Sequence, residues 1–150
     1  MYSADDRQVG DVMLREIVTA SRDATLSEAQ GLMRAARLRH LVVVEDGIVI
    51  GLVSHRALLE ASLATLRESL RAGGADMLGE ITINHLVRED PLTIPPECSL
   101  ETAASRMLAL RIGCLPVATP SPRGPRLEGL ITEAGLLRAA YLPPPPALPA

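Results

Sequence analysis

Residues 51–59, GLVSHRALL, return in altered form as residues 129–137, GLITEAGLL. Each phrase runs from glycine through two apolar residues to a small hydroxyl residue, Ser54 or Thr132. A hydroxyl residue placed where a strand gives way to a helix is a preferred cap of that helix. The repetition therefore predicts two copies of one strand-to-helix unit within a single chain.

The similarity extends upstream of both phrases. Residues 9–44 align without gaps on residues 83–118. In the first copy, Thr25 and Glu28 form a capping-box pattern, and apolar residues follow at helical spacing. Ser99 is the equivalent cap in the second copy. We expect one helix in each copy, with these residues facing the core: Leu26, Ala29, Met33 and Ala36, and then Leu100, Ala103, Met107 and Leu110.

Two strands are expected after the first helix. The segment LVVVEDGIVIGLV, residues 41–53, contains two β-branched runs joined by Asp46 and Gly47, a dipeptide that tolerates the positive φ angles of a tight hairpin. The second copy has four additional residues here, within TPSPRGPR at residues 119–126, and we expect a loop insertion. Each copy then has the order strand or loop, helix, strand, strand, helix, which predicts an α/β (α+β) fold with a duplicated unit.

Composition restricts the functions that are open to the chain. Its 150 residues, 47% of them hydrophobic, suffice for one compact domain with a sizeable core. A net charge of -3 and 1% aromatic residues argue against nucleic-acid binding. The acidic start and the interrupted apolar runs favour a cytoplasmic protein without a membrane segment. No catalytic or metal-binding constellation falls on one element, so we expect neither an enzyme nor a metal site.

The duplicated pattern resembles the CBS-domain family, specifically the tandem pair called a Bateman module, of the stand-alone bacterial type. The likeness rests on VGDVM and INHLV, on VTASRDATLSEA and LTIPPECSLETA, on LRHLVVVEDG and IGCLPVAT, and on the two phrases quoted first. It implies two β-α-β-β-α repeats, residues 9–72 and 83–141, packed with pseudo-twofold symmetry. We expect three flanking segments: an N-terminal arm at 1–8, a linker at 73–82 and a Pro-rich, poorly ordered tail at 142–150.

The resemblance also implies where a ligand would bind. Modules of this family bind adenosine-containing ligands in two clefts between the repeats, and they are not enzymes by themselves. One implied cleft combines Thr19, Ala20, Leu41, Val42, Ile131 and Thr132. The other combines Thr93, Ile94, Leu115, Pro116, Val53 and Ser54. Three further residues, at or beside positions that lie near phosphates in some members, are Arg39, His40 and Arg56.

Two hypotheses about function follow. The family pattern continues Ser/Thr-x-x-Asp, with the Asp accepting hydrogen bonds from ribose hydroxyls, but this chain has Ala57 and Gly135 at that position. The first hypothesis is a regulatory sensor of an adenine nucleotide, with AMP, ADP and ATP as candidates, or of a related phosphate-bearing ligand. It needs no cofactor and transmits the ligand state through its dimer or to a partner protein, such as a regulated enzyme or transporter. The second is a scaffold that keeps the fold and has lost its ligand. Ser54 and Thr132 fit both hypotheses, because a hydroxyl can bind phosphate or serve only as a cap.

A homodimer is expected under either hypothesis. The helices that follow Ser54 and Thr132 carry more apolar residues than one pair of small sheets can cover. Uncovered apolar patches usually mark an interface, and a twofold dimer is the commonest closed assembly. The residues expected in this interface are Leu58, Leu59, Leu63, Leu66, Leu136 and Leu137.

Overall fold

The computed structural model of the chain describes residues 6–73, 77–88 and 92–142. The predicted tail, apart from its first residue, and parts of the predicted arm and linker lie outside the described residues. The chain forms two compact units. The first-copy unit contains Val18–Leu92 and Pro120–Leu127, and the second-copy unit contains Met1–Ile17, Thr93–Thr119 and Glu128–Ala150. The start of each sequence copy therefore belongs to the unit that is built around the other copy.

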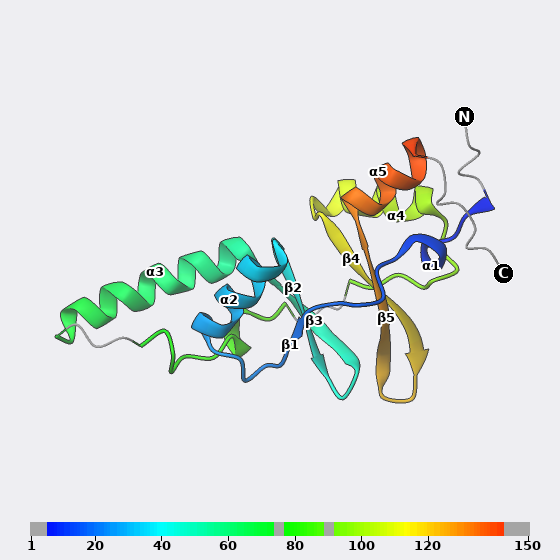
Figure 1. Cartoon of the computed structure of the whole chain (residues 1–150). Coiled ribbons are helices and arrows are strands. Elements are labelled where there is room, and N and C mark those ends of the chain that lie inside the picture. The colour runs from blue at the N-terminus through cyan, green and yellow to red at the C-terminus, as the bar shows by residue number, and fades with distance from the viewer. Residues whose placement is uncertain (1–5, 74–76, 89–91, 143–150) are drawn as a thin grey trace. The chain divides into compact units, whose positions relative to one another are not determined.

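The first-copy unit is a small sheet covered by two helices (Figure 1). Its strands are β1 (Thr19–Ala20), β2 (His40–Glu45) and β3 (Ile48–Ser54), and its helices are α2 (Leu26–Ala36), α3 (His55–Arg71) and the 3-10 helix η2 (Asn84–Leu86). Strand β1 pairs parallel with β2, and β2 pairs antiparallel with β3. Asp46 and Gly47 have φ angles of 51° and 81°, which confirms the predicted tight hairpin.

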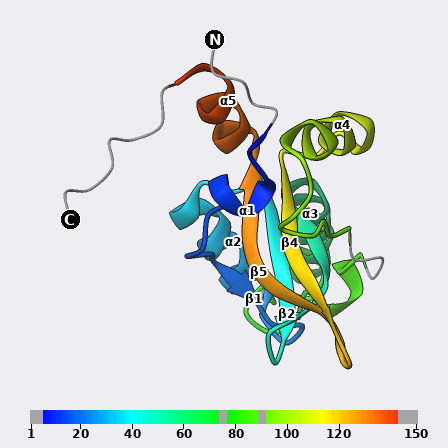
Figure 2. The ribbon, with the colours of Figure 1, turned by 90° about the vertical axis from the view of Figure 1, so that its right-hand side faces the viewer.

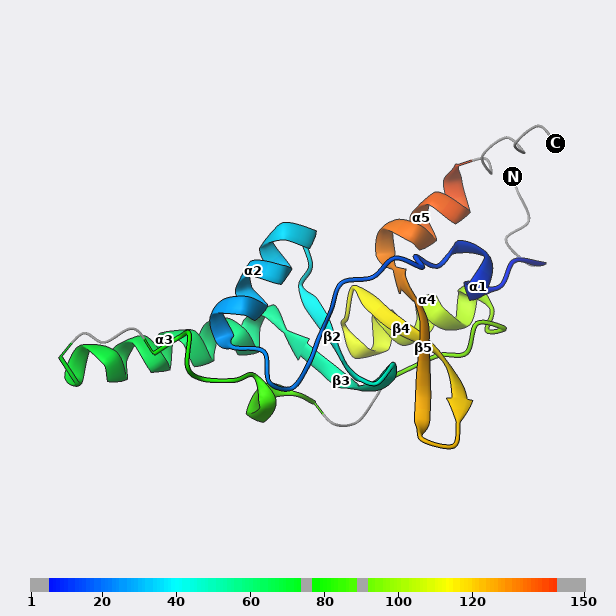
Figure 3. The same cartoon turned by 60° about the horizontal axis from the view of Figure 1, so that its bottom comes forward.

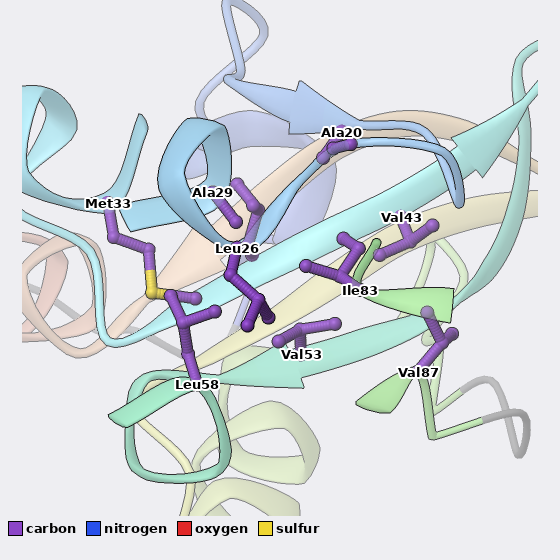
Figure 4. Packing of buried hydrophobic residues seen from close by; sticks show 11 residues of the cluster. Ala20, Leu26, Ala29, Met33, Val43, Val53, Leu58, Ile83 and Val87 are labelled. Atoms are coloured by element: carbon purple, nitrogen blue, oxygen red, sulfur yellow. The ribbon is translucent and has the colours of Figure 1, made fainter. Parts of the chain in front are cut away.

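Aliphatic side chains from several elements of this unit fill its core (Figure 4). Leu26 comes from α2, Val53 from β3 and Leu58 from α3, and all three are fully buried. Burial of one such side chain contributes roughly 1.5–3 kcal/mol. Ile83, from the start of the second copy, is also fully buried, and its N–H donates to the Ala24 carbonyl at 2.8 Å. The core of the first copy is thus completed by residues of the second.

The second-copy unit has the corresponding elements. They are the helices α1 (Val9–Val12), α4 (Leu100–Leu110) and α5 (Glu133–Tyr141) and parts of the strands β4 (Cys114–Ser121) and β5 (Gly124–Thr132). The hairpin ends of these two strands, within Pro120–Leu127, belong to the first-copy unit. Helices α4 and α5 contact each other beside the ends of β4 and β5 (Figure 2). Val9 N–H donates to the Cys98 carbonyl, and Gly10 N–H donates to the Pro96 carbonyl, both at 2.8 Å. These bonds hold the start of the first copy in the unit of the second.

Helices α2 and α4 demonstrate the repeat at the level of single residues. Each has 11 residues and follows a hydroxyl residue, Thr25 or Ser99, whose side chain accepts a backbone N–H. Each ends at an arginine in the left-handed conformation, with φ angles of 53° and 55°. Met33 and Met107 are 2% and 4% exposed. Their equivalent burial confirms the prediction that the two copies share one fold.

The four additional residues of the second copy lengthen a hairpin, so the predicted loop is wrong. Strand β4 continues to Ser121 and β5 begins at Gly124, and the Ser121 hydroxyl donates to the Gly124 carbonyl at 2.6 Å. The longer hairpin reaches β3, because Leu127 N–H donates to the Gly47 carbonyl at 2.9 Å. The strand order is β1-β2-β3-β5-β4, which leaves Pro120 on an edge strand, where a missing N–H is tolerated.

Each repeated phrase begins with a glycine, Gly51 or Gly129, because another backbone segment passes close to the strand at that position. A Cβ on Gly51 would lie 2.0 Å from the Arg88 carbonyl oxygen. A Cβ on Gly129 would lie 2.7 Å from the Leu14 carbonyl oxygen. The crossing segments are held by isolated bridges, which join Leu52 to Arg88 and Leu14 to Leu130. Only a residue without a side chain allows the two backbones to approach so closely.

The burial of two leucines differs from the prediction. Leu110 was expected in the core but is 39% exposed, because α4 ends there and the chain turns away through Arg111. Leu58 was expected in an interface but is fully buried in the first turn of α3. Leu136 is half-buried. The other leucines expected at the surface are exposed as predicted: Leu59, Leu63, Leu66 and Leu137.

Helix α3 has an unusual distribution of polar and apolar residues. After Leu58, its buried residues are Ser62, Thr65 and Ser69. Its leucines at 59, 63, 66 and 70 are 44%, 56%, 43% and 77% exposed. The helix continues past α2, and residues 77–81 run beside its far end (Figure 3). Across the described parts of the chain, no helix combines the length and the apolar character needed to cross a membrane.

Candidate functional site

The two strand-to-helix junctions have the same local structure. Ser54 Oγ accepts a hydrogen bond from the Ala57 N–H at 3.0 Å, and Thr132 Oγ1 accepts one from the Gly135 N–H at 3.0 Å. Both hydroxyl residues are therefore helix caps, as the sequence predicts. A hydroxyl that accepts one bond still has its own O–H to donate. Each junction thus presents a potential donor beside the positive end of a helix dipole.

The first helical residue at each junction is also held in the same way in the two copies. His55 N–H donates to the Arg39 carbonyl at 2.7 Å, and Glu133 N–H donates to the Gly113 carbonyl at 3.0 Å. Each bond ties the start of α3 or α5 to the residues that precede the hairpin. The geometry of the junction is therefore set by the backbone.

The first-copy unit holds these predicted site residues: Thr19, Ala20, Arg39, His40, Leu41, Val42, Val53, Ser54 and Arg56. The register of β2 and β3 places Leu41 opposite Val53 and His40 opposite Ser54. Leu41 and Val53 are fully buried, whereas Thr19 is half-buried. The buried pair belongs to the core, so it can support a ligand site but its side chains do not reach solvent.

The three predicted cationic residues differ in their surroundings. Arg39 is exposed. Arg56 Nε lies 3.4 Å from Glu60 Oε1, and both side chains are largely exposed, so this ion pair contributes little to stability. His40 is half-buried, and burial lowers the pKa of its imidazole below 6.5. The imidazole of His40 is therefore mostly neutral at pH 7 in the protein without a ligand.

The second-copy unit holds the remaining predicted site residues: Thr93, Ile94, Leu115, Pro116, Ile131 and Thr132. Ile94 pairs with β4, and its N–H donates to the Pro116 carbonyl at 3.1 Å. Ile94, Leu115 and Ile131 are at most 1% exposed. Each cleft that the resemblance implies takes four of its six residues from one unit and two from the other. The composition of the complete clefts stays a prediction.

A cavity of about 550 Å³ lies within the second-copy unit, beside α1 and α5. It is lined by Thr132 and by three charged residues that were not selected from the sequence, Arg7, Asp11 and Arg138. Comparison of the aligned copies could have drawn attention to Arg138, because Glu60 stands at the equivalent position of the first copy. Arg7 had no such signal, because its place depends on how the N-terminal residues pack.

The thiol of Cys114 does not have the surroundings of a reactive cysteine. Burial, together with the nearby Glu133 charge, raises the pKa of Cys114 to about 11, so its thiol stays protonated at neutral pH. Cys98 is half-buried. Among the residues that the structure describes, no three His, Cys, Asp or Glu side chains gather in a way that could hold a metal ion.

Comparisons with known proteins agree with the repeat. A family model described as CBS domain matches residues 9–64 and 79–141. A CBS domain-containing protein of Dictyostelium discoideum is 29% identical over 133 residues, which cover 86% of this chain and 88% of that protein. The crystal structure of the AcuB protein of Vibrio cholerae is similar with a TM-score of 0.70 and 30% identity, over 89% of each chain.

One solved relative carries a nucleotide. The CBS-pair protein CBSX2 from Arabidopsis thaliana was crystallised in complex with AMP. That structure has a TM-score of 0.70 and 25% identity to this chain. The matched region covers 89% of this chain and 96% of the CBSX2 chain. This chain also matches an inosine-5'-monophosphate dehydrogenase of Korarchaeum cryptofilum with 26% identity, but it spans only 21% of the length of that enzyme.

Proposed function

The chain belongs to the CBS-domain family, with the domain present twice in tandem, and on this premise we propose that it is a regulatory sensor module. Its ligand is a phosphate-bearing adenine nucleotide, with AMP, ADP and ATP as the candidates. The ligand binds in clefts between the repeats, at the two residue sets that the sequence predicts. Its binding is transmitted through a homodimer or to a partner enzyme or transporter.

The observation that carries this proposal is the repeated hydroxyl at a helix start. Ser54 and Thr132 each cap a helix and each retain an O–H donor, at the end of the helix that favours anions. The AMP complex of CBSX2, a protein with 25% identity to this chain, supports an adenine nucleotide as the ligand class.

Selectivity should rest on phosphate. Ala57 and Gly135 stand where the family pattern has a carboxylate for the ribose hydroxyls. A charge-assisted hydrogen bond contributes roughly 1.5–3 kcal/mol, so its loss weakens a nucleoside by about tenfold to a few hundredfold. We expect adenosine to bind much more weakly than its phosphates, and we expect nucleotide affinity to fall with added salt. Calorimetry at two salt concentrations measures both effects.

A scaffold without a ligand is the second candidate, and the absence of both carboxylates favours it. Thermal shifts against AMP, ADP, ATP, S-adenosylmethionine, NADH and cyclic dinucleotides separate the two functions. A ligand at 100 times its dissociation constant adds about 2.7 kcal/mol to the free energy of unfolding, which raises the melting temperature measurably. A panel without any shift favours the scaffold.

Variants at the junctions sharpen this test. Ser54→Ala and Thr132→Ala should each reduce binding in one cleft, whereas Ala57→Asp should increase binding by restoring an acceptor for ribose. If Ala57→Asp stays folded and still binds no nucleotide, the clefts are not nucleotide sites and the scaffold function takes the lead.

A further inference from the structure

We propose that the cavity beside α1 and α5 is an anion site, in which Arg7 and Arg138 bind the phosphate group of the ligand. The proposal deepens the proposed function and rests on it for the identity of the nucleotide. It assigns the phosphate to the second copy and to two residues outside the sets that the resemblance implies. The argument starts from the shape of the cavity.

The cavity offers both apolar and charged surface. Its volume of about 550 Å³ lies within the range of roughly 300–1,000 Å³ that is usual for small-molecule sites. Apolar lining comes from Val12, Leu14 and Leu142, and the hydroxyl residue Thr132 lies at the same cavity. Such a site suits a ligand that has an anionic group and an apolar portion.

Gly135 keeps space open between α5 and α1. A Cβ at this position would lie 3.3 Å from Thr132 Oγ1 and 3.7 Å from the Val12 carbonyl oxygen. A larger side chain would therefore be directed into the space between the two helices. The residue that leaves the ribose without a carboxylate also leaves room for another group.

The two arginines approach the cavity from different segments. The Arg7 guanidinium donates to the Ala139 carbonyl of α5, which holds its head at the cavity and leaves further N–H groups to donate. Arg138 lies on α5, and its side chain is exposed. Among the described residues, neither arginine forms an ion pair. A planar guanidinium can bind a phosphate through two parallel hydrogen bonds.

One acid also lines the cavity, but it is already engaged. Asp11 Oδ2 accepts the Gln8 N–H at 2.8 Å, as part of the cap of α1. Two arginines and one aspartate leave an excess of one positive charge in the lining. The electrostatic preference of the cavity is therefore for an anion.

The first copy lacks this arrangement. Glu60 stands at the position equivalent to Arg138, and it is paired with Arg56 at 3.4 Å. The aligned position of Arg7 is Ile81, which has no charge. The two copies share the helix cap but differ in the charge of these two positions. The anion site is therefore specific to the second-copy unit.

Calorimetry with two probes, ADP and inorganic pyrophosphate, tests the assignment on the full chain. Arg138→Glu gives the second copy the charge of the first, and it should weaken both probes by at least about tenfold. Arg138→Lys keeps the charge and should weaken them less, because lysine cannot bind phosphate in a planar bidentate way. Arg67→Glu, an equal charge change at an exposed residue of α3, should leave both affinities within about twofold.

The outcomes separate this inference from the proposed function. If ADP binds the wild type and Arg138→Glu equally, the phosphate lies elsewhere, so the inference fails and the nucleotide function stands. If pyrophosphate binding depends on Arg138 and ADP does not bind, the anion site holds and the nucleotide function fails. If neither probe binds the wild type, the inference is overturned.

Discussion

At the scale of single residues, Gly51 illustrates how the absence of one atom permits the fold. The Arg88 carbonyl oxygen occupies the space that a Cβ on Gly51 would need, only 2.0 Å away. This oxygen belongs to the backbone, and the neighbouring Arg88 N–H donates to the Leu52 carbonyl at 3.0 Å, so it cannot move aside easily. The crossing segment also delivers Ile83 and Val87 to the core of the first-copy unit.

Gly51→Ala should therefore destabilise the chain. Overpacking of this kind costs about 1–3 kcal/mol of the free energy of unfolding, and a clash with backbone belongs at the upper end. Gly31 is the matched control, because it lies inside α2 with nothing within 4 Å of its would-be Cβ. Gly31→Ala should stabilise by about 0.5–1 kcal/mol. Urea unfolding measures both changes, and equal midpoints for Gly51→Ala and the wild type would disprove a rigid crossing.

The lowered pKa of His40 predicts that the free energy of unfolding depends on pH. Burial lowers its pKa below the ordinary 6.5, so between these two values the unfolded chain binds more protons than the folded one. Stability should therefore be full above pH 6.5 and should fall as the pH drops from 6.5 through the folded pKa. Urea midpoints at pH 7.5 and 5.5 should differ less for His40→Gln than for the wild type. His85 is exposed, and His85→Gln should retain the wild-type difference.

At the scale of elements, helix α3 buries hydroxyl residues on the face that packs against α2. Gln30 Nε2 donates to Ser62 Oγ at 2.7 Å, and the Ser62 hydroxyl donates to the Leu58 carbonyl at 2.7 Å. Two turns further along, Ser69 Oγ is buried without a hydrogen-bond partner among the described residues. The buried hydroxyl of Ser62 therefore stabilises the fold, whereas the buried hydroxyl of Ser69 destabilises it.

Alanine substitutions at these two serines should change stability in opposite directions. Ser62→Ala removes two hydrogen bonds and should cost about 0.5–1.5 kcal/mol. Ser69→Ala removes an unsatisfied hydroxyl and adds helix propensity, so it should raise the free energy of unfolding by about 1 kcal/mol. Chemical denaturation of both variants measures the difference. A destabilised Ser69→Ala would mean that this hydroxyl has a bonding partner in solution.

The elements that depend on local chemistry could be predicted from the sequence. The caps at Thr25 and Ser99 and the turn at Asp46 follow from neighbouring residues alone. The lengthened β4-β5 hairpin could not, because prolines indicate a loop locally while the decisive hydrogen bond joins Leu127 to Gly47 across the chain. Long-range pairing overrides local propensity at such places.

The candidate site divides in the same way. The hydroxyls of the two junctions lie within repeated phrases and could be predicted. The place of Arg7 at the cavity could not, because Arg7 meets the Ala139 carbonyl at a separation of 132 residues. Nothing in the local sequence of residues 6–8 indicates that contact.

At the scale of the whole molecule, the leucines that α3 exposes predict a partner surface. Leu59, Leu63, Leu66 and Leu70 recur at spacings of four, three and four, so they form one stripe along the helix. Contiguous apolar stripes of this kind are unusual on monomers. A second copy of the chain offers an identical stripe, and a twofold axis brings the two together in a closed dimer. We therefore predict a homodimer in which α3 contributes the central contact.

Light scattering at micromolar concentration should give a dimer mass for the wild type and a monomer mass for Leu63→Glu, because the variant would bury an unpaired charge in the interface. Leu108→Glu is the control: Leu108 is 80% exposed on α4, outside the stripe, and its replacement should leave the dimer intact. Dimerisation also links stability to concentration, so the wild-type melting temperature should rise with protein concentration while that of Leu63→Glu should not. A wild-type monomer would exclude the dimer, and a dimeric Leu63→Glu would place its interface away from α3.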